Sequence, residues 1–133
     1  MKRSVSIFFL VGLHCSLGGV PAMAQNLTGN ELLDICTSGS EDLARLGYCA
    51  GYVSGVIEGM KWGAAALLML GETPREDVEA LSSSLLGFCN PEGVTLGQHV
   101  GVVTKHLQDN PAERHASARV IVQTALQDAF PCF

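Results

Sequence analysis

Residues 47–63, GYCAGYVSGVIEGMKWG, place a glycine at every fourth position of a segment that otherwise has the composition of a helix. Each glycine costs a helix interior about 0.8 to 1.0 kcal/mol relative to alanine, so five cost roughly 4 to 5 kcal/mol unless contacts offset them. Each four-residue step turns the glycine track by about 40°. We therefore expect a groove that winds around a central helix and lets different helices cross closely at its two ends. The adjoining face would be filled by Cys49, Tyr52, Val53, Val56 and Met60.

This apolar segment also suits a membrane helix with glycine faces. However, Glu58 and Lys61 lie in its middle, and charges are costly in lipid. We therefore predict the central helix of a folded domain, without stable membrane insertion. A single helix over residues 41–70 would be about 45 Å long, which is long for a domain of this size. We expect a bend or break near Gly47 or Gly63.

Capping residues indicate where the other helices begin. A Thr or Asn followed three positions later by Glu or Gln can satisfy two free backbone donors at once. Such pairs occur at Thr28/Glu31, Thr73/Glu76, Thr95/Gln98 and Asn110/Glu113, and the glycine-rich helix is expected to start near Ser40. No segment alternates apolar and polar residues over the length of a strand. The sequence predicts one all-α domain over residues 25–133, a compact bundle of about five helices with no sheet.

Residues 1–24 have the pattern of a secretory signal peptide. Lys2 and Arg3 precede an apolar run, and the small-residue site Ala22-Met23-Ala24 follows it. Cleavage would leave thirteen acidic and six basic side chains, because Lys2 and Arg3 are lost from the eight basic residues. This acidic balance disfavours nucleic acid and anionic membrane as partners.

Four cysteines remain after the predicted signal peptide: Cys36, Cys49, Cys89 and Cys132. An even number in an exported chain favours two disulfides over metal binding or thiol catalysis. Three pairings are possible. We favour Cys36 with Cys49, which closes a short loop between neighbouring helices, and Cys89 with Cys132, which ties the end of the chain to its middle.

Candidate catalytic and metal-binding groups are sparse. The serine of Gly51-Tyr-Val-Ser54-Gly55 lies one place too late for a nucleophile elbow. His99 and His106 share a helical face and His115 lies beyond them, but no His-x3-His or Cys-x2-Cys spacing occurs. We expect these histidines to pack at the margin of the core or at an interface, with no metal and no cofactor. By elimination, the sequence indicates a binding protein and not an enzyme.

Several short motifs occur in a recognisable order along the chain. They are Cys36, the run CAGYVSG at 49–55, FCNP at 88–91, TLGQ at 95–98, His106-Leu107, Asn110-Pro111 and AFPC at 129–132. This order resembles the Rap/Tai family of type VI secretion amidase immunity proteins, over essentially the whole chain after the predicted signal peptide.

The resemblance implies a small helical periplasmic protein, commonly a homodimer, that binds and blocks a peptidoglycan amidase effector. Members of the family are described as reaching into the amidase cleft with a protruding loop. By analogy, the partner-binding residues would be Glu72, Arg75, Glu76, Asp77, Asn90, Glu92 and Gly93. Their position at helix starts also explains most of them as solvated capping residues.

Two alternatives fit the same composition. The first is a small periplasmic acid-stress chaperone, which would have to unfold partly and bind clients near about pH 2 to 3. The second is a metal protein or an enzyme, which requires His99, His106 and His115 to converge.

Overall fold

The computed structural model describes residues 26–132, so the predicted signal peptide lies outside the described residues. The described chain forms five α-helices and one short 3₁₀ turn: α1 (Gly29–Cys36), α2 (Leu43–Leu70), α3 (Arg75–Leu86), α4 (Leu96–Asp109), η1 (Pro111–Glu113) and α5 (Ala118–Ala129). Between residues 26 and 132, strand-like pairing is limited to two isolated bridges, Thr28 with Ser117 and Phe88 with Pro131. The predicted all-α fold is therefore confirmed.

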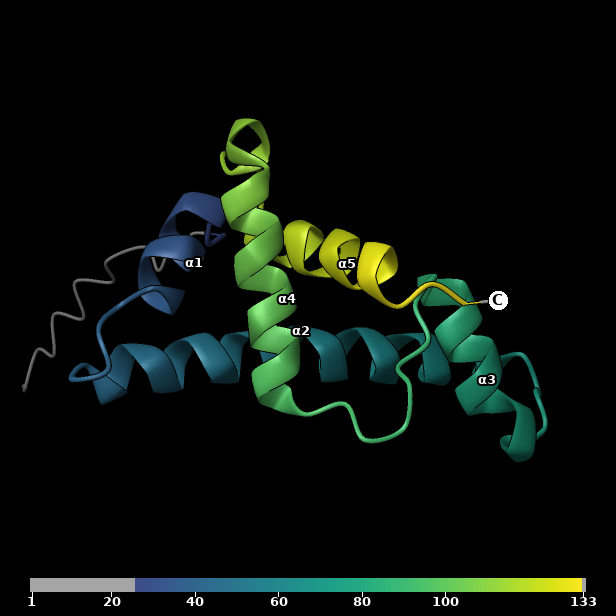
Figure 1. Ribbon diagram of the computed structural model, residues 1–133. Helices are drawn as coiled ribbons and strands as arrows, with labels where there is room; N and C mark the ends of the chain where they lie inside the picture. The colour runs from purple at the N-terminus through teal and green to yellow at the C-terminus, as the bar shows by residue number, and fades with distance from the viewer. Residues whose placement is uncertain (1–25, 133) are drawn as a thin grey trace, which may run out of the picture.

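Helix α2 forms one long side of the molecule (Figure 1). In that view α1 and α5 lie above it, α4 crosses in front of it, and α3 lies beside its C-terminal end. The expected break near Gly47 or Gly63 is wrong, because α2 runs through 28 residues without interruption, which is about 42 Å. The far end of α2 extends beyond the main core and is supported by α3, which folds back along it; Lys61 pairs with Glu79 at 3.0 Å.

One hydrophobic core joins α1, α2, α4 and α5, and the loop before α4 adds the fully buried Phe88. Its other members are Leu32, Val53, Ile57, Val103, Leu107, Ala118, Ile121, Val122, Ala125 and Leu126. Burying a large aliphatic or aromatic side chain contributes about 1.5 to 3 kcal/mol. The two core residues of α2, Val53 and Ile57, are four positions apart and so share one face of the helix. The core therefore lies on one side of α2 only.

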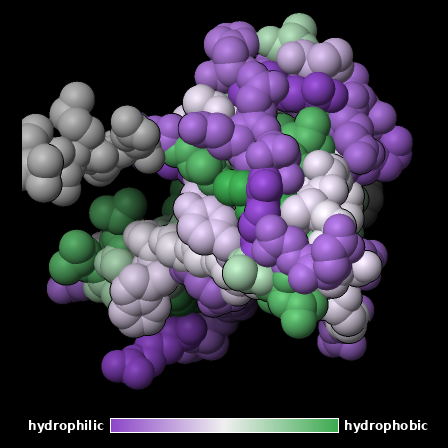
Figure 2. Space-filling model, turned by 90° about the vertical axis from the view of Figure 1, so that its left-hand side faces the viewer, coloured by the Kyte–Doolittle hydropathy of each residue, from purple (hydrophilic) through white to green (hydrophobic). Residues whose placement is uncertain are grey.

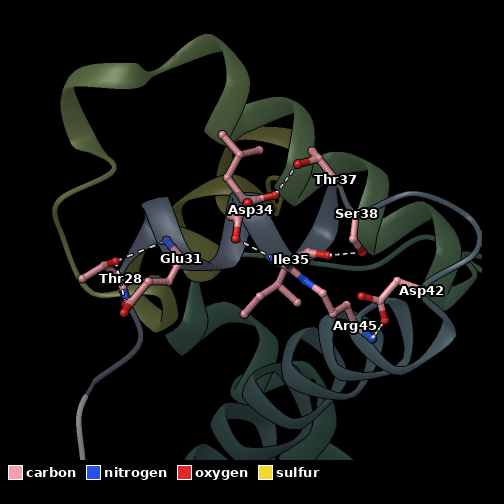
Figure 3. A network of polar contacts seen from close by, with 9 residues as sticks. Thr28, Glu31, Asp34, Ile35, Thr37, Ser38, Asp42 and Arg45 are labelled. Atoms are coloured by element: carbon pink, nitrogen blue, oxygen red, sulfur yellow. Dashed lines mark hydrogen bonds and ion pairs between the residues drawn. The ribbon is translucent and has the colours of Figure 1, made fainter.

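The predicted caps at Thr28 and Thr95 are confirmed. The backbone N–H of Thr28 donates to Glu31 Oε2 at 2.8 Å, and the N–H of Glu31 donates back to Thr28 Oγ1 at 3.3 Å (Figure 3). The backbone N–H of Thr28 and its hydroxyl, which also donates to Glu31 Oε2 at 2.8 Å, lower the pKa of Glu31. The N–H of Gln98 likewise donates to Thr95 Oγ1 at 3.2 Å.

The other two predicted caps are wrong. Pro74 precedes α3 and makes no side-chain cap, and Asn110 begins only η1, so that α5 starts later, after Ser117. The second difference has a clear cause: the chain between η1 and α5 pairs with the start of α1. Gly29 N donates to Ala116 O at 3.0 Å, and Ala118 N donates to Leu27 O at 2.7 Å.

Both favoured disulfides form, Cys36–Cys49 and Cys89–Cys132. The first joins the end of α1 to the buried face of α2. The ion pair between Asp34 and Arg45 lies beside it and links the same two helices (Figure 3). The second joins the loop after α3 to the segment that follows α5, where Cys89 N also donates to Phe130 O at 2.8 Å. The loop between α3 and α4 is therefore firmly anchored at its beginning.

Candidate partner-binding surface

The predicted contact residues fall into two groups at opposite ends of α3. Glu72, Arg75, Glu76 and Asp77 are all exposed in or just after the turn between α2 and α3. Asn90, Glu92 and Gly93 belong to the loop between α3 and α4, about 18 Å away along the axis of α3. Two of these positions have a backbone that favours a sharp turn, since φ is 62° at Glu72 and 79° at Gly93.

Asn90 differs from the other six because it is partly buried. It lines a hollow of about 210 Å³ together with Ser54, Glu58, Lys61 and His99. The Oδ1 atom of Asn90 and the Nε2 atom of His99 are buried and have no hydrogen-bond partner among residues 26–132. The hollow thus combines several polar groups between α2, α4 and the loop that precedes α4.

His99 lies at the edge of the core, as the sequence predicts. Only 8% of the residue is exposed, and its ring packs edge-on against Phe130 with the ring centroids 5.8 Å apart. Burial lowers the pKa of His99, and the Lys61 ammonium lowers it further, while Glu58 opposes the shift. The imidazole is therefore neutral at pH 7.

The other two histidines lie in different surroundings. His106 lies between Glu113, at 3.7 Å, and Asp128, at 3.6 Å. His115 is exposed and its Nδ1 is 2.9 Å from the Ala112 carbonyl oxygen. Over residues 26–132, no three His, Cys, Asp or Glu side chains come close enough to hold a metal ion.

The five glycines of α2 do not serve as crossing points within the chain. A Cβ atom built on any of these glycines would meet no atom within 4 Å beyond its chain neighbours and the adjacent backbone of α2; they are Gly47, Gly51, Gly55, Gly59 and Gly63. The predicted close approach of neighbouring helices is therefore wrong, because the other helices contact α2 on its opposite face. The glycines instead leave the backbone bare on the outside of the molecule.

Large apolar side chains are exposed along the same helix. Trp62 is 70% exposed and Tyr48 is 54% exposed, and Leu67 and Leu70 are open toward its C-terminal end. Figure 2 shows green and white surface at the lower left of the molecule, with purple surface below it and mostly purple surface above it. Within the described residues, α2 alone is long and apolar enough to cross a membrane by length and composition, yet its Val53 and Ile57 belong to the core. The sequence alone did not lead us to predict this exposed surface. The available signal was a run of uncharged residues, spaced three and four positions apart, along one side of α2.

The sequence matches the family described as Rap1a immunity proteins over residues 28–132, a range that includes all five helices and all four bonded cysteines. The chain belongs to the Rap1a family of immunity proteins. No curated protein and no solved structure gives a significant match. For a Rap1a protein the family suggests an immunity protein against a type VI effector, and immunity proteins of this family are generally not enzymes. The functional question therefore concerns which surface binds the toxin.

Proposed function

We propose that this Rap1a protein is a periplasmic immunity protein that binds and inhibits a type VI secreted peptidoglycan amidase. Family membership over residues 28–132 is the observation that carries the proposal. Two disulfides suit the oxidising periplasm, and the signal-like pattern of residues 1–24 suits export.

We further propose that the amidase contacts the two polar turns at the ends of α3. Glu72, Glu76, Asp77 and Glu92 supply acidic groups there, and Arg75 supplies one basic group. The second turn is the better candidate to enter a cleft, because Cys89 is disulfide-bonded before it and Thr95 caps the helix after it. A loop that is held in place before binding loses little conformational entropy on association.

The test is a peptidoglycan digestion assay with the amidase encoded beside this gene. The wild-type protein is expected to abolish digestion, and Glu92→Lys is expected to weaken inhibition at least tenfold, because it reverses a charge at the proposed contact. Glu41→Lys makes the same change at an exposed position near the start of α2 and should have no effect. Absence of binding and inhibition by the wild-type protein would refute the proposed function; equal inhibition by both variants would refute the contact assignment.

We also propose that the protein acts as a homodimer. The exposed apolar residues of α2, among them Tyr48, Trp62, Leu67 and Leu70, support this proposal.

A further inference from the structure

The hollow of about 210 Å³ between α2, α4 and the loop before α4 has a mixed lining. Its polar members are Ser54, Glu58, Lys61, Asn90 and His99, and its apolar members are Ile57, Val94 and Leu96. Pockets for whole small molecules usually measure about 300 to 1,000 Å³, whereas one water occupies about 30 Å³ in the liquid. The hollow is therefore of a size for one functional group on a short alkyl stem.

The charges around the hollow favour a cation. Glu58 is exposed and makes no ion pair with another residue in the range 26–132. The Lys61 ammonium lies 3.0 Å from the Glu79 carboxylate, which compensates its charge. His99 is neutral at pH 7, as described above. One positive group thus stands against two negative groups, and the carboxylate of Glu58 is the one left over.

The hollow also has hydrogen-bond acceptors that lack a donor. The buried Oδ1 atom of Asn90 has no partner in the described part of the chain, and neither has the buried Nε2 atom of His99. A neutral imidazole carries one acceptor nitrogen in either tautomer. A buried acceptor without a donor is unfavourable, so a ligand that brings several N–H groups would gain from both residues.

Both residues are held in place by the fold. Asn90 follows Cys89, which is disulfide-bonded to Cys132 and whose N–H donates to Phe130 O at 2.8 Å. The ring of His99 packs edge-on against the ring of Phe130. A site whose groups are already ordered loses little conformational entropy when a ligand binds.

We infer that this hollow binds a single organic cation with N–H donors, the guanidinium or ammonium group at the end of an alkyl chain. The charged group lies between Glu58 and Asn90, and the stem lies along the apolar side chains of Val94 and Leu96. Such amphipathic cations commonly bury their stems against apolar surface and keep the charge at the edge. The cation is either a free solute or a Lys or Arg side chain of a bound protein. The site itself does not depend on the proposed function.

Other classes of ligand fit less well. The carboxylate of Glu58 repels an anion, and the two acceptors without donors give it no hydrogen bond. A metal ion requires more ligands than are present, because no group of three His, Cys, Asp or Glu side chains forms among residues 26–132. A neutral amide satisfies Asn90 but leaves Glu58 without an opposite charge.

The first experiment titrates the mature protein with n-propylguanidinium at pH 7 and constant ionic strength, observed by NMR. n-Propylurea is the matched control, since it has nearly the same shape and no charge. The cation is expected to shift the resonances of Asn90 and His99 saturably, with a dissociation constant at least threefold below that of the urea. Equal binding of the two probes, or shifts that spare both residues, would overturn the site.

Two variants test the sign of the charge. Glu58→Gln should weaken binding of n-propylguanidinium at least threefold, because it removes the uncompensated carboxylate. Lys61→Met should strengthen binding, because it leaves Glu79 uncompensated as well. Glu41→Gln removes an exposed carboxylate near the start of α2 and should change nothing. Glu58 is exposed, so its variant should fold, and circular dichroism checks this. Equal affinity of Glu58→Gln and wild type would overturn the assignment.

A last measurement separates the two sources of the cation. Excess n-propylguanidinium chloride is added to the amidase inhibition assay, with sodium chloride at the same concentration as the control. Loss of inhibition with the cation alone would assign the site to a Lys or Arg side chain of the amidase. Unchanged inhibition, with n-propylguanidinium bound, would assign it to a free solute. If the protein binds no amidase, the proposed function fails and the NMR titration still decides whether the site exists.

Discussion

At the scale of single residues, His99 shows how a buried polar group couples the fold to pH. Its imidazole is enclosed between α2 and Phe130, with an Nε2 atom that has no hydrogen-bond partner in the described part of the chain. Glu58 and Lys61 of α2 are the charged groups that influence it. A buried imidazole in this position resists protonation.

The protein should lose stability as the pH falls below about 6.5, the ordinary pKa of histidine. The pKa of His99 is lowered in the folded chain, so in this range the unfolded chain binds a proton that the folded chain does not. The contribution is complete above that pH and is lost progressively below it. His99→Phe keeps the aromatic packing and should flatten the decline between about pH 7 and pH 5 in urea denaturation. His115→Phe, at an exposed histidine, should leave it unchanged; the reverse pattern would contradict the role of His99.

At the scale of helices, two glycines near helix starts have opposite effects on packing. Gly29 is buried at the start of α1, where an added Cβ would lie 3.0 Å from the Arg114 carbonyl oxygen and 3.0 Å from Leu107 Cδ2. Gly47, in α2, has open space on the same test. Sequence shows only that glycine is present, and the neighbours that decide its role come from distant segments.

Gly29→Ala and Gly47→Ala should therefore change stability in opposite directions. The first forces the core apart near Ile121 and is expected to lower the free energy of unfolding by about 1 to 3 kcal/mol. The second removes the helix penalty of glycine and is expected to raise it by about 0.8 to 1.0 kcal/mol. Chemical denaturation monitored by circular dichroism measures both values. Stabilisation by Gly29→Ala would show that the approach of α1 to α5 is looser than described.

At the scale of the whole molecule, the two disulfides close loops of different length. Cys36–Cys49 spans 13 residues and locks neighbouring helices, whereas Cys89–Cys132 spans 43 residues and ties the end of the chain to the loop before α4. The longer loop restricts the unfolded chain more.

Replacing Cys89 and Cys132 by alanine is expected to lower the free energy of unfolding by about 4 kcal/mol, against about 3 kcal/mol for the other pair. The same change should loosen the loop of Asn90 to Gly93 and thereby weaken inhibition of the amidase, if that loop makes the contact. Guanidinium denaturation of the two double variants compares the stabilities. An equal or larger loss from the Cys36 and Cys49 pair would mean that packing around the buried Cys49 outweighs loop closure.

The sequence was sufficient to predict the class of fold and the two capped helix starts at Thr28 and Thr95, since these depend on local chemistry. It also predicted the pairing of the cysteines, because the short loop from Cys36 to Cys49 leaves Cys89 and Cys132 for the second bond. It was not sufficient to place the start of α5, because the chain before that helix pairs with α1, more than 80 residues earlier. Nor did it predict the straight course of α2 or its bare outer face. Both depend on which side of the helix the rest of the chain covers.

The bare glycines of α2 have a consequence for how the protein exchanges hydrogen with water. Without side chains above them, the amide groups around Gly51, Gly55 and Gly59 are shielded from solvent only by their own helix. Deuterium should enter this stretch faster than it enters the buried helix α5, although both belong to one core. Slower uptake there with rising protein concentration would make isotope labelling a direct gauge of self-association.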